Sequence, residues 1–146
     1  MADRVIAGSD HAGLALRGEA VKTAQALGRE VEDLGPAAGE SVDYPDLARR
    51  VAEAVTAGRG LGILVCGTGI GMSMAANKVK GIRAAHCSSE FEARMARAHN
   101  DANVLCLGER SVGLGLGAAI VKAFLETPFE GGRHARRVQK IMDLER

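Results

Sequence analysis

A glycine-rich segment that begins with a cysteine is the first place where the sequence suggests chemistry. It reads Cys66-Gly67-Thr68-Gly69-Ile70-Gly71 and follows an apolar run. Alternating glycines let successive backbone N–H groups converge on one concavity, and a helix starting directly afterwards would add to its attraction for an anion. The segment lacks the lysine and the spacing of a P-loop, and its GxGxG pattern fits a dinucleotide fingerprint poorly. It therefore predicts an anion-binding loop without a nucleotide motif.

Cys66 is a candidate thiolate base because it stands at the mouth of this loop. Loop amides and a helix start could favour its thiolate form. The competing interpretation is a small buried hydrophobe, which is how we interpret Cys87 and Cys106. Three cysteines without a C-x-x-C pair indicate neither a disulfide framework nor a zinc site. We expect reduced thiols and a cytoplasmic protein.

Two further segments place polar side chains at the ends of predicted elements. Ser9-Asp10-His11 follows the first strand, and His99-Asn100-Asp101 ends a helix. Ser and Asp are common N-caps, and His and Asn are common near helix C-termini. In isolation, capping explains either segment about as well as function does.

The C-terminal tail is basic. Residues 131–146 hold five Lys and Arg against two Asp and Glu, a formal charge of +3. A solvated basic face is the usual explanation of such a run. However, Arg133, Arg136 and Arg137 open a predicted helix, where the helix dipole disfavours cations. A bound phosphate would offset this conflict, since arginine binds phosphate in a bidentate manner, and Arg110 could join the cluster.

The elements that must position these segments alternate between short apolar strands and amphipathic helices. We expect strands over residues 4–8, 30–34, 61–66, 82–86 and 103–107. Strands alternating with helices predict an α/β fold, a three-layer α/β/α Rossmann-like parallel sheet of about five strands in one domain over residues 1–146. In such folds ligands bind beyond the carboxyl ends of the strands, which directs attention to the segments after the first, third and fifth strands.

The helices are predicted from apolar stripes and from glycine and proline positions. Pro45 suits the first turn of a helix, and Gly28 suits a helix end. The stripes expected to be buried are Leu16, Ala20, Ala24 and Leu27; Leu47, Val51, Ala54 and Val55; Phe91, Met95 and Ala98; Leu114, Ala118, Val121 and Leu125; and Val138, Ile141 and Met142. Gly113, Gly115 and Gly117 fall where a helix should start, at a cost of roughly 1 kcal/mol each, so we expect this helix to pack closely against the sheet or a partner subunit.

Composition excludes several classes of function. With three Phe, one Tyr and no Trp, binding of single-stranded nucleic acid by base stacking is not expected. The formal net charge of +1 argues against a general polyanion binder. No apolar run approaches the ~18 residues of a membrane span, and the mixed charges at the N-terminus do not form a signal peptide. Glycine is twice as common as usual, at 19 of 146 residues.

Taken together, the motifs resemble those of ribose-5-phosphate isomerase type B, a family grouped with the galactose-6-phosphate isomerase subunits. The resemblance also includes Asn77-Lys78-Val79 and Gly131-Gly132-Arg133-His134, runs in the same order, and covers essentially the whole chain. It implies interconversion of ribose 5-phosphate and ribulose 5-phosphate through ring opening and an enediolate, with no metal or organic cofactor. By the same resemblance, Cys66 is the general base for the C2 proton and Thr68 lies beside the proton path. The enediolate oxygen would be stabilised by backbone amides of the loop: Gly67, Gly69 and Gly71.

The resemblance assigns the other candidates as well. His99 resembles the acid/base that opens the sugar ring, with Asp10 assisting at the sugar oxygens. Asn100 and Tyr44 resemble substrate contacts. The implied phosphate ligands are basic side chains: His11, Arg110, Arg133 and Arg137. The family implies a homodimer or homotetramer with sites shared between subunits, the C-terminal helix at the interface, and His99 and the arginine tail serving the partner's Cys66 loop.

Two alternatives stay open at this point. The first is an isomerase for a six-carbon substrate, allose 6-phosphate or galactose 6-phosphate, because the same base and anion loop would serve. The second is a non-catalytic phosphate- or nucleotide-binding module on the same scaffold, against which the missing nucleotide motifs count.

Overall fold

The computed structural model describes residues 4–145, and its centre is a sheet of five parallel strands. They are β1 (Arg4–Ser9), β2 (Glu30–Asp33), β3 (Leu61–Cys66), β4 (Ala84–His86) and β5 (Val104–Gly108), in the order β2-β1-β3-β5-β4. The predicted α/β class and strand number are confirmed. β4 is shorter than the predicted 82–86, because only residues 84–86 pair with β5.

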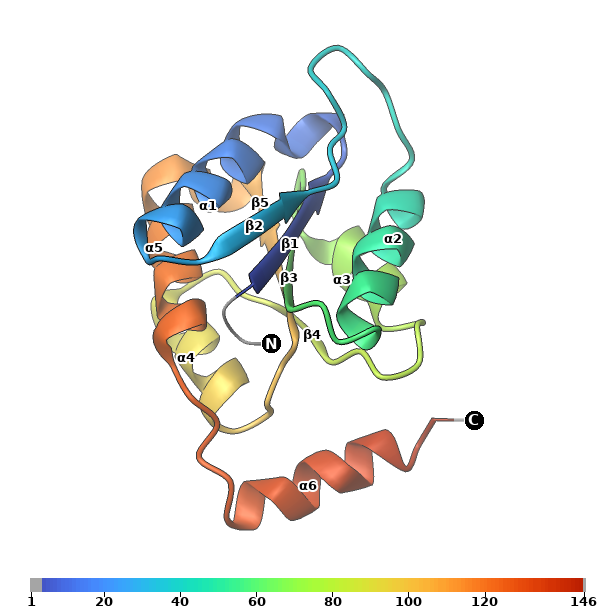
Figure 1. Ribbon diagram of the computed structural model, residues 1–146, viewed down its shortest axis with the longest axis vertical. Coiled ribbons are helices and arrows are strands. Elements are labelled where there is room, and N and C mark those ends of the chain that lie inside the picture. The colour runs from blue at the N-terminus through green and yellow to red at the C-terminus, as the bar shows by residue number, and fades with distance from the viewer. Residues whose placement is uncertain (1–3, 146) are drawn as a thin grey trace.

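Helices cover both faces of the sheet (Figure 1). One face carries α1 (Leu14–Ala26), α4 (Glu90–Ala98) and α5 (Glu109–Glu126), and the other carries α2 (Tyr44–Thr56) and α3 (Ile70–Ala76). Successive strand residues point to opposite faces. Thus Ile63 and Val65 pack in the first core and Leu64 and Cys66 in the second. Because both faces are buried, the central strands are almost wholly apolar.

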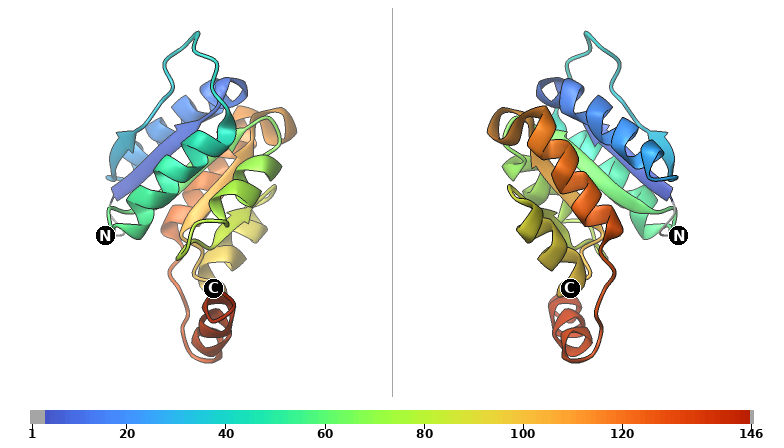
Figure 2. Two further views of the ribbon diagram at one scale, coloured as in Figure 1. Left: turned by 90° about the vertical axis from the view of Figure 1, so that its right-hand side faces the viewer. Right: turned by 90° about the vertical axis from the view of Figure 1, so that its left-hand side faces the viewer.

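The last helix, α6 (Arg133–Met142), lies outside both helical layers, beyond the amino ends of the strands (Figure 2). Of its residues only His134 is buried. Ile141 is 44% exposed, and Leu144 just after the helix is 78% exposed. The predicted apolar stripe therefore exists but is not packed on the core. In the described part of the chain, no helix is long and apolar enough to cross a membrane.

Besides Ile141, two other residues of the stripes that were predicted to be buried are exposed. Phe91 is 64% exposed and Leu114 is 45% exposed. The buried face of α4 consists of small side chains: Ala93, Ala96 and Ala98. Alanine gives a weak periodic signal, so the larger phenylalanine dominated the sequence pattern.

The glycines around residue 115 have two separate explanations. Gly113 has φ 71° and ψ −175°, so the helix is broken there and the glycine occupies a conformation that L side chains rarely adopt. A Cβ at Gly117 would lie 2.4 Å from Leu16 Cδ1. Close packing within the chain thus occurs at Gly117 alone, and it is against α1 rather than the sheet, whereas a Cβ at Gly113 or Gly115 would meet nothing within 4 Å.

Candidate active site

A cleft opens at the carboxyl ends of the central strands, where the strand order places it. From β1 the chain moves to β2 on one side and then to β3 on the other, so the loops that follow β1 and β3 part. The cleft has a volume of about 410 Å³. Its walls include seven of the predicted site residues: Asp10, Tyr44, Cys66, Gly67, Thr68, Gly71 and Arg110. The exposed side chains of Ile70 and Met74 complete the lining and were not predicted.

Cys66 is the last residue of β3 and is 5% exposed. Its Sγ accepts a hydrogen bond from the Gly69 N–H at 3.1 Å. Gly69 has φ 82°, a left-handed conformation that favours glycine, and this turn returns its amide to the sulfur. An amide donor aimed at sulfur favours negative charge on it. Thr68 Oγ1 accepts from the Ile70 N–H at 3.3 Å, so two amides of the loop are engaged within the loop itself.

Close approach to glycine backbone positions two other cleft residues. A Cβ at Gly71 would lie 2.5 Å from Tyr44 Cε1, so the tyrosine ring rests directly on this glycine. The Arg110 N–H donates to the Gly67 carbonyl at 3.0 Å, and its Nη1 would lie 3.3 Å from a Cβ at Gly67. Glycine at both positions therefore brings a phenol and a guanidinium to the loop.

Asp10 both caps a short helix and lines the cleft. Its Oδ1 accepts from the Ala12 N–H at 2.9 Å, at the start of the 3-10 helix η1 (His11–Gly13). His11 is exposed beside it and is not part of the cleft lining. The capping interpretation thus holds without excluding function.

A buried arginine that was not predicted ties two cleft loops together. Arg17 Nη1 donates to Ser9 Oγ at 2.7 Å, and its Nη2 donates to the Pro36 carbonyl at 2.7 Å. These bonds link the loop that carries Asp10 to the loop that leads to Tyr44. Arginine within a predicted helix normally indicates a solvated face, so little in the sequence indicates this role.

The remaining candidates lie at the other end of the sheet. His99 follows α4 directly, shortly before β5 begins, and Asn100 is exposed beside it. Arg133 and Arg137 are exposed on α6. All strands run in the same direction, so this amino edge is opposite to the edge that bears Cys66. Within one chain these four residues do not reach the cleft.

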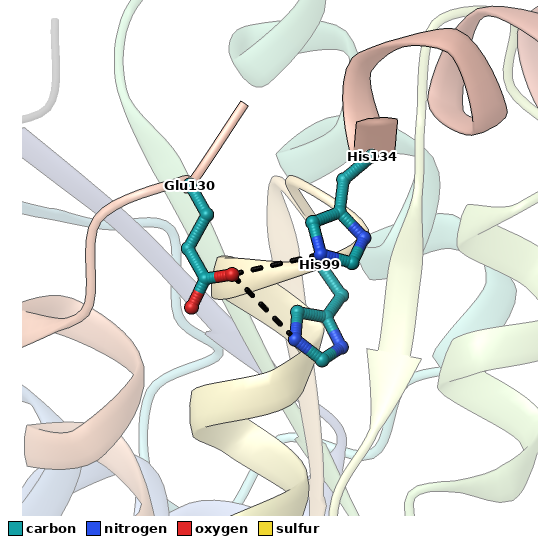
Figure 3. Close-up of side chains that lie close together, drawn as sticks. All are labelled: His99, Glu130 and His134. Carbon is teal, nitrogen blue, oxygen red and sulfur yellow. Dashed lines mark ion pairs between the residues drawn. The ribbon is translucent and has the colours of Figure 1, made fainter. Parts of the chain in front are cut away.

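Three side chains gather at this edge and form what we call the amino-edge cluster: His99, Glu130 and His134 (Figure 3). The two imidazole rings stack with centroids 4.1 Å apart and planes inclined by 10°. Glu130 Oε1 lies 3.8 Å from His99 Nε2 and 3.5 Å from His134 Nε2. Desolvation by burial lowers the pKa of His134, and the nearby His99 lowers it further. His134 belongs to the predicted Gly131-Gly132-Arg133-His134 motif, whereas Glu130 was not predicted as a site residue.

Arg83 holds this edge together and was not predicted either. Its Nη2 donates to the Asp101 carbonyl at 2.8 Å and its Nε to the Asn100 carbonyl at 3.2 Å. Its Nη1 lies 3.2 Å from Met142 Sδ on α6. One side chain thus joins the turn after His99 to the C-terminal helix.

Fold and cleft together define a class: a parallel α/β protein whose carboxyl edge presents a thiol, a glycine loop and an arginine. The comparisons with known proteins make this class specific. Residues 5–141 match the Ribose/Galactose Isomerase family, to which the chain belongs. This confirms the family indicated by the motifs, and the chain is an isomerase.

The following relatives are similar to this chain over nearly the full length of both proteins. Ribose-5-phosphate isomerase B of Escherichia coli K12 is 48% identical over 143 residues, covering 97% of this chain and 96% of that protein. The structure of Clostridium thermocellum ribose-5-phosphate isomerase B is 53% identical with a TM-score of 0.93, covering 97% of this chain and 96% of that one. The Trypanosoma brucei type B enzyme is 48% identical with a TM-score of 0.94, covering 99% and 100%.

Proposed function

We propose that the chain interconverts ribose 5-phosphate and ribulose 5-phosphate. The observation that carries the proposal is the Cys66 thiol, which sits in the cleft with the Gly69 amide directed at its sulfur. The chain's family and the names of its relatives supply the substrate class.

The proposed chemistry moves a proton from C2 to C1 and a second proton from O2 to O1, and it needs no oxidant. After ring opening, the Cys66 thiolate takes the C2 proton, and the electron pair forms an enediolate between C2 and C1 with the negative charge on O1. The O2 hydroxyl proton passes to O1, Cys66 returns its proton to C1, and the C2 carbonyl of the ketose forms. Amides of the glycine loop, at Gly67 and Gly71, would stabilise the enediolate oxygen; such preorganised donors typically supply several kcal/mol. Thr68 lines the cleft together with these residues.

The proposal includes a second copy of the chain, because one chain separates the candidates. We infer that His99, Asn100, Arg133 and Arg137 of one copy complete the cleft of the other. His99 would open the sugar ring opposite Asp10, and the two arginines would bind the phosphate with Arg110 and His11. Exposed apolar side chains support this assembly at both places: Tyr44, Ile70 and Met74 at the cleft, and Ile141 and Leu144 at α6. A second copy would cover them, with α6 in the interface.

The decisive test is turnover of ribose 5-phosphate by tag-free protein in the presence of EDTA. We expect ribulose 5-phosphate to form, and replacement of the base in Cys66→Ala to reduce kcat by about 10²–10⁴. Full activity of Cys66→Ala would overturn the assignment of the base, and absence of turnover in the wild type would overturn the reaction.

Substrate length is tested in the same assay with allose 6-phosphate. We expect a lower kcat/KM than for ribose 5-phosphate. The reverse order would make the chain a six-carbon sugar phosphate isomerase with the same base.

A further inference from the structure

We propose that the amino-edge cluster, His99, Glu130 and His134, binds a divalent transition-metal ion of the Zn²⁺ type. We further infer that this ion inhibits the enzyme. The second part rests on the proposed function, because it requires His99 to act in the isomerisation.

The donor atoms have the identity and spacing that zinc requires. Imidazole nitrogen and carboxylate oxygen are both zinc ligands, at about 2.0–2.2 Å from the ion. Around a tetrahedral ion at that radius, donor atoms lie about 3.4 Å apart. Glu130 Oε1 already lies 3.5 Å and 3.8 Å from the two Nε2 atoms, and all three donor atoms lie within 4.8 Å of one another. Three protein ligands leave a fourth position for water.

Backbone contacts bring the three ligands together. The Glu130 N–H donates to the Ala98 carbonyl at 3.0 Å, which fixes Glu130 beside the end of α4 and next to His99. The His134 N–H donates to the Gly131 carbonyl at 3.1 Å, and the His134 residue is 8% exposed. The ligands therefore come from three segments that the fold already holds in place.

Ion binding requires one imidazole to turn. An ion must lie near the plane of each ring it binds, and nearly parallel stacked planes do not meet at a common point. The His99 side chain is 38% exposed and that of His134 is 10% exposed, so His99 is the ring with freedom to rotate. The ion would thus occupy His99 Nε2 and also turn the ring away from its stacked position.

Charges near the cluster set the expected strength of binding. Glu130 supplies one negative charge, while Arg133 and Arg137 on the same helix as His134 oppose a cation. We therefore expect a reversible site that a chelator empties, rather than a permanent structural metal.

The test measures zinc binding directly by calorimetry on tag-free, full-length protein. Because Cys66 lies in the cleft and thiolate is a strong zinc ligand, the measurements use the Cys66→Ser background. We expect one Zn²⁺ per chain. Glu130→Gln should weaken binding at least about tenfold, since even changes to outer-shell partners cost that much. Glu126→Gln, the same charge change at an exposed residue four positions earlier, should leave binding unchanged.

Three results would overturn the site. They are absence of binding in the Cys66→Ser background, equal binding by Glu130→Gln and Glu126→Gln, and a cobalt complex that shows thiolate charge-transfer absorption in that background. Co²⁺ spectra showing a tetrahedral ion with nitrogen and oxygen ligands would support it.

Inhibition is measured separately, on chains with Cys66 intact. Zn²⁺ should slow turnover of ribose 5-phosphate by the wild type, and EDTA should restore it. The zinc concentration for half-inhibition should rise at least about tenfold in Glu130→Gln, in parallel with binding. Binding without inhibition would overturn the second part and keep the site. If the wild type does not turn over ribose 5-phosphate at all, the proposed function fails while the calorimetry still decides the metal site.

Discussion

The carboxyl-edge cleft and the amino-edge cluster are built in different ways. In the cleft, backbone approaches backbone or side chain closely: Tyr44 rests on Gly71, and the Gly69 amide reaches Cys66. At the amino edge, side chains from separate segments meet, as in the stack of His99 on His134. The first kind of site leaves a glycine pattern in the sequence, whereas the second leaves isolated residues far apart in it. These two regions are the halves that we propose to combine into one site across two copies of the chain.

The hypothesis that the two regions form one site across two chains is tested most directly by damaging each region on a different chain. Cys66→Ala and His99→Asn should each lose about 10²–10⁴ in kcat. When the two variants are refolded together, half of the dimers are mixed, and each has one intact site of two. Activity should therefore return to about one quarter of the wild-type value. The measurement is turnover before and after mixing.

The control is mixing two preparations of Cys66→Ala, which must stay inactive. If the mixed pair also stays inactive although hybrid dimers are shown to form, the two halves do not serve a common site.

Thiol chemistry should separate the cleft from the buried core, which holds Cys87 and Cys106. Burial raises the pKa of the Cys87 thiol to about 12, and the charge of Glu92 adds to the effect. Compared with an ordinary value of 9.0, this lowers the thiolate population at pH 8 about a thousandfold. Burial also raises the pKa of Cys106.

Iodoacetamide should thus modify Cys66, the one cysteine that lines the cleft among the described residues, and abolish activity. Peptide mass spectrometry measures the three rates. Faster labelling of Cys87 or Cys106 would contradict the assignment.

Weakening the amino edge alone should have a smaller effect. Arg83→Gln removes donors to two carbonyls of the turn after His99 and the contact with Met142. We expect kcat to fall up to about a hundredfold through misplacement of His99, and the free energy of unfolding to fall by about 2 kcal/mol. Urea unfolding and steady-state kinetics measure both, with Arg94→Gln on the exposed side of α4 as control. An unchanged kcat would show that the turn keeps its shape without Arg83.

Two matched glycine substitutions, one in the cleft and one outside it, should have the smallest effects. Gly71→Ala places a methyl group within 2.5 Å of Tyr44, so the ring must move and kcat/KM should fall about tenfold. Gly115→Ala meets nothing within 4 Å and should raise stability by about 0.5 kcal/mol without changing kinetics. Thermal melting measures the stability of both variants, and steady-state kinetics measures their kcat/KM. Equal kinetic effects would mean that the Gly71 contact does not position Tyr44.

Much of the fold could be predicted because its strong signals are local. The apolar runs before Gly67 and Gly108, the proline at the start of α2 and the glycine after α1 marked strands and helix ends to within one or two residues. The exposure of Phe91 could not be predicted, since it depends on how closely α4 packs through its alanines. The break at Gly113 depends on a single backbone conformation that sequence does not reveal.

The candidate site, too, could be predicted only where its signals are local in the sequence. The loop residues that line the cleft were found because chain order places the ends of parallel strands at one edge. Arg17, Arg83 and Glu130 were missed because each has a partner from another segment of the chain, a backbone carbonyl for the two arginines and the His99 ring for Glu130. Only the assembled fold shows such contacts.

The attachment of α6 has a consequence for association. The Glu145 Oε1 accepts from the Gly81 N–H at 2.7 Å, and Met142 contacts Arg83, so both contacts fix the far end of the helix to its own chain. A helix that is already ordered before it meets another surface loses little conformational entropy on docking. Preorganisation of this kind would let a modest apolar area, with Ile141 and Leu144 at its centre, support tight pairing of chains. Removing either contact should therefore weaken the self-association that we propose, although both contacts lie within one chain.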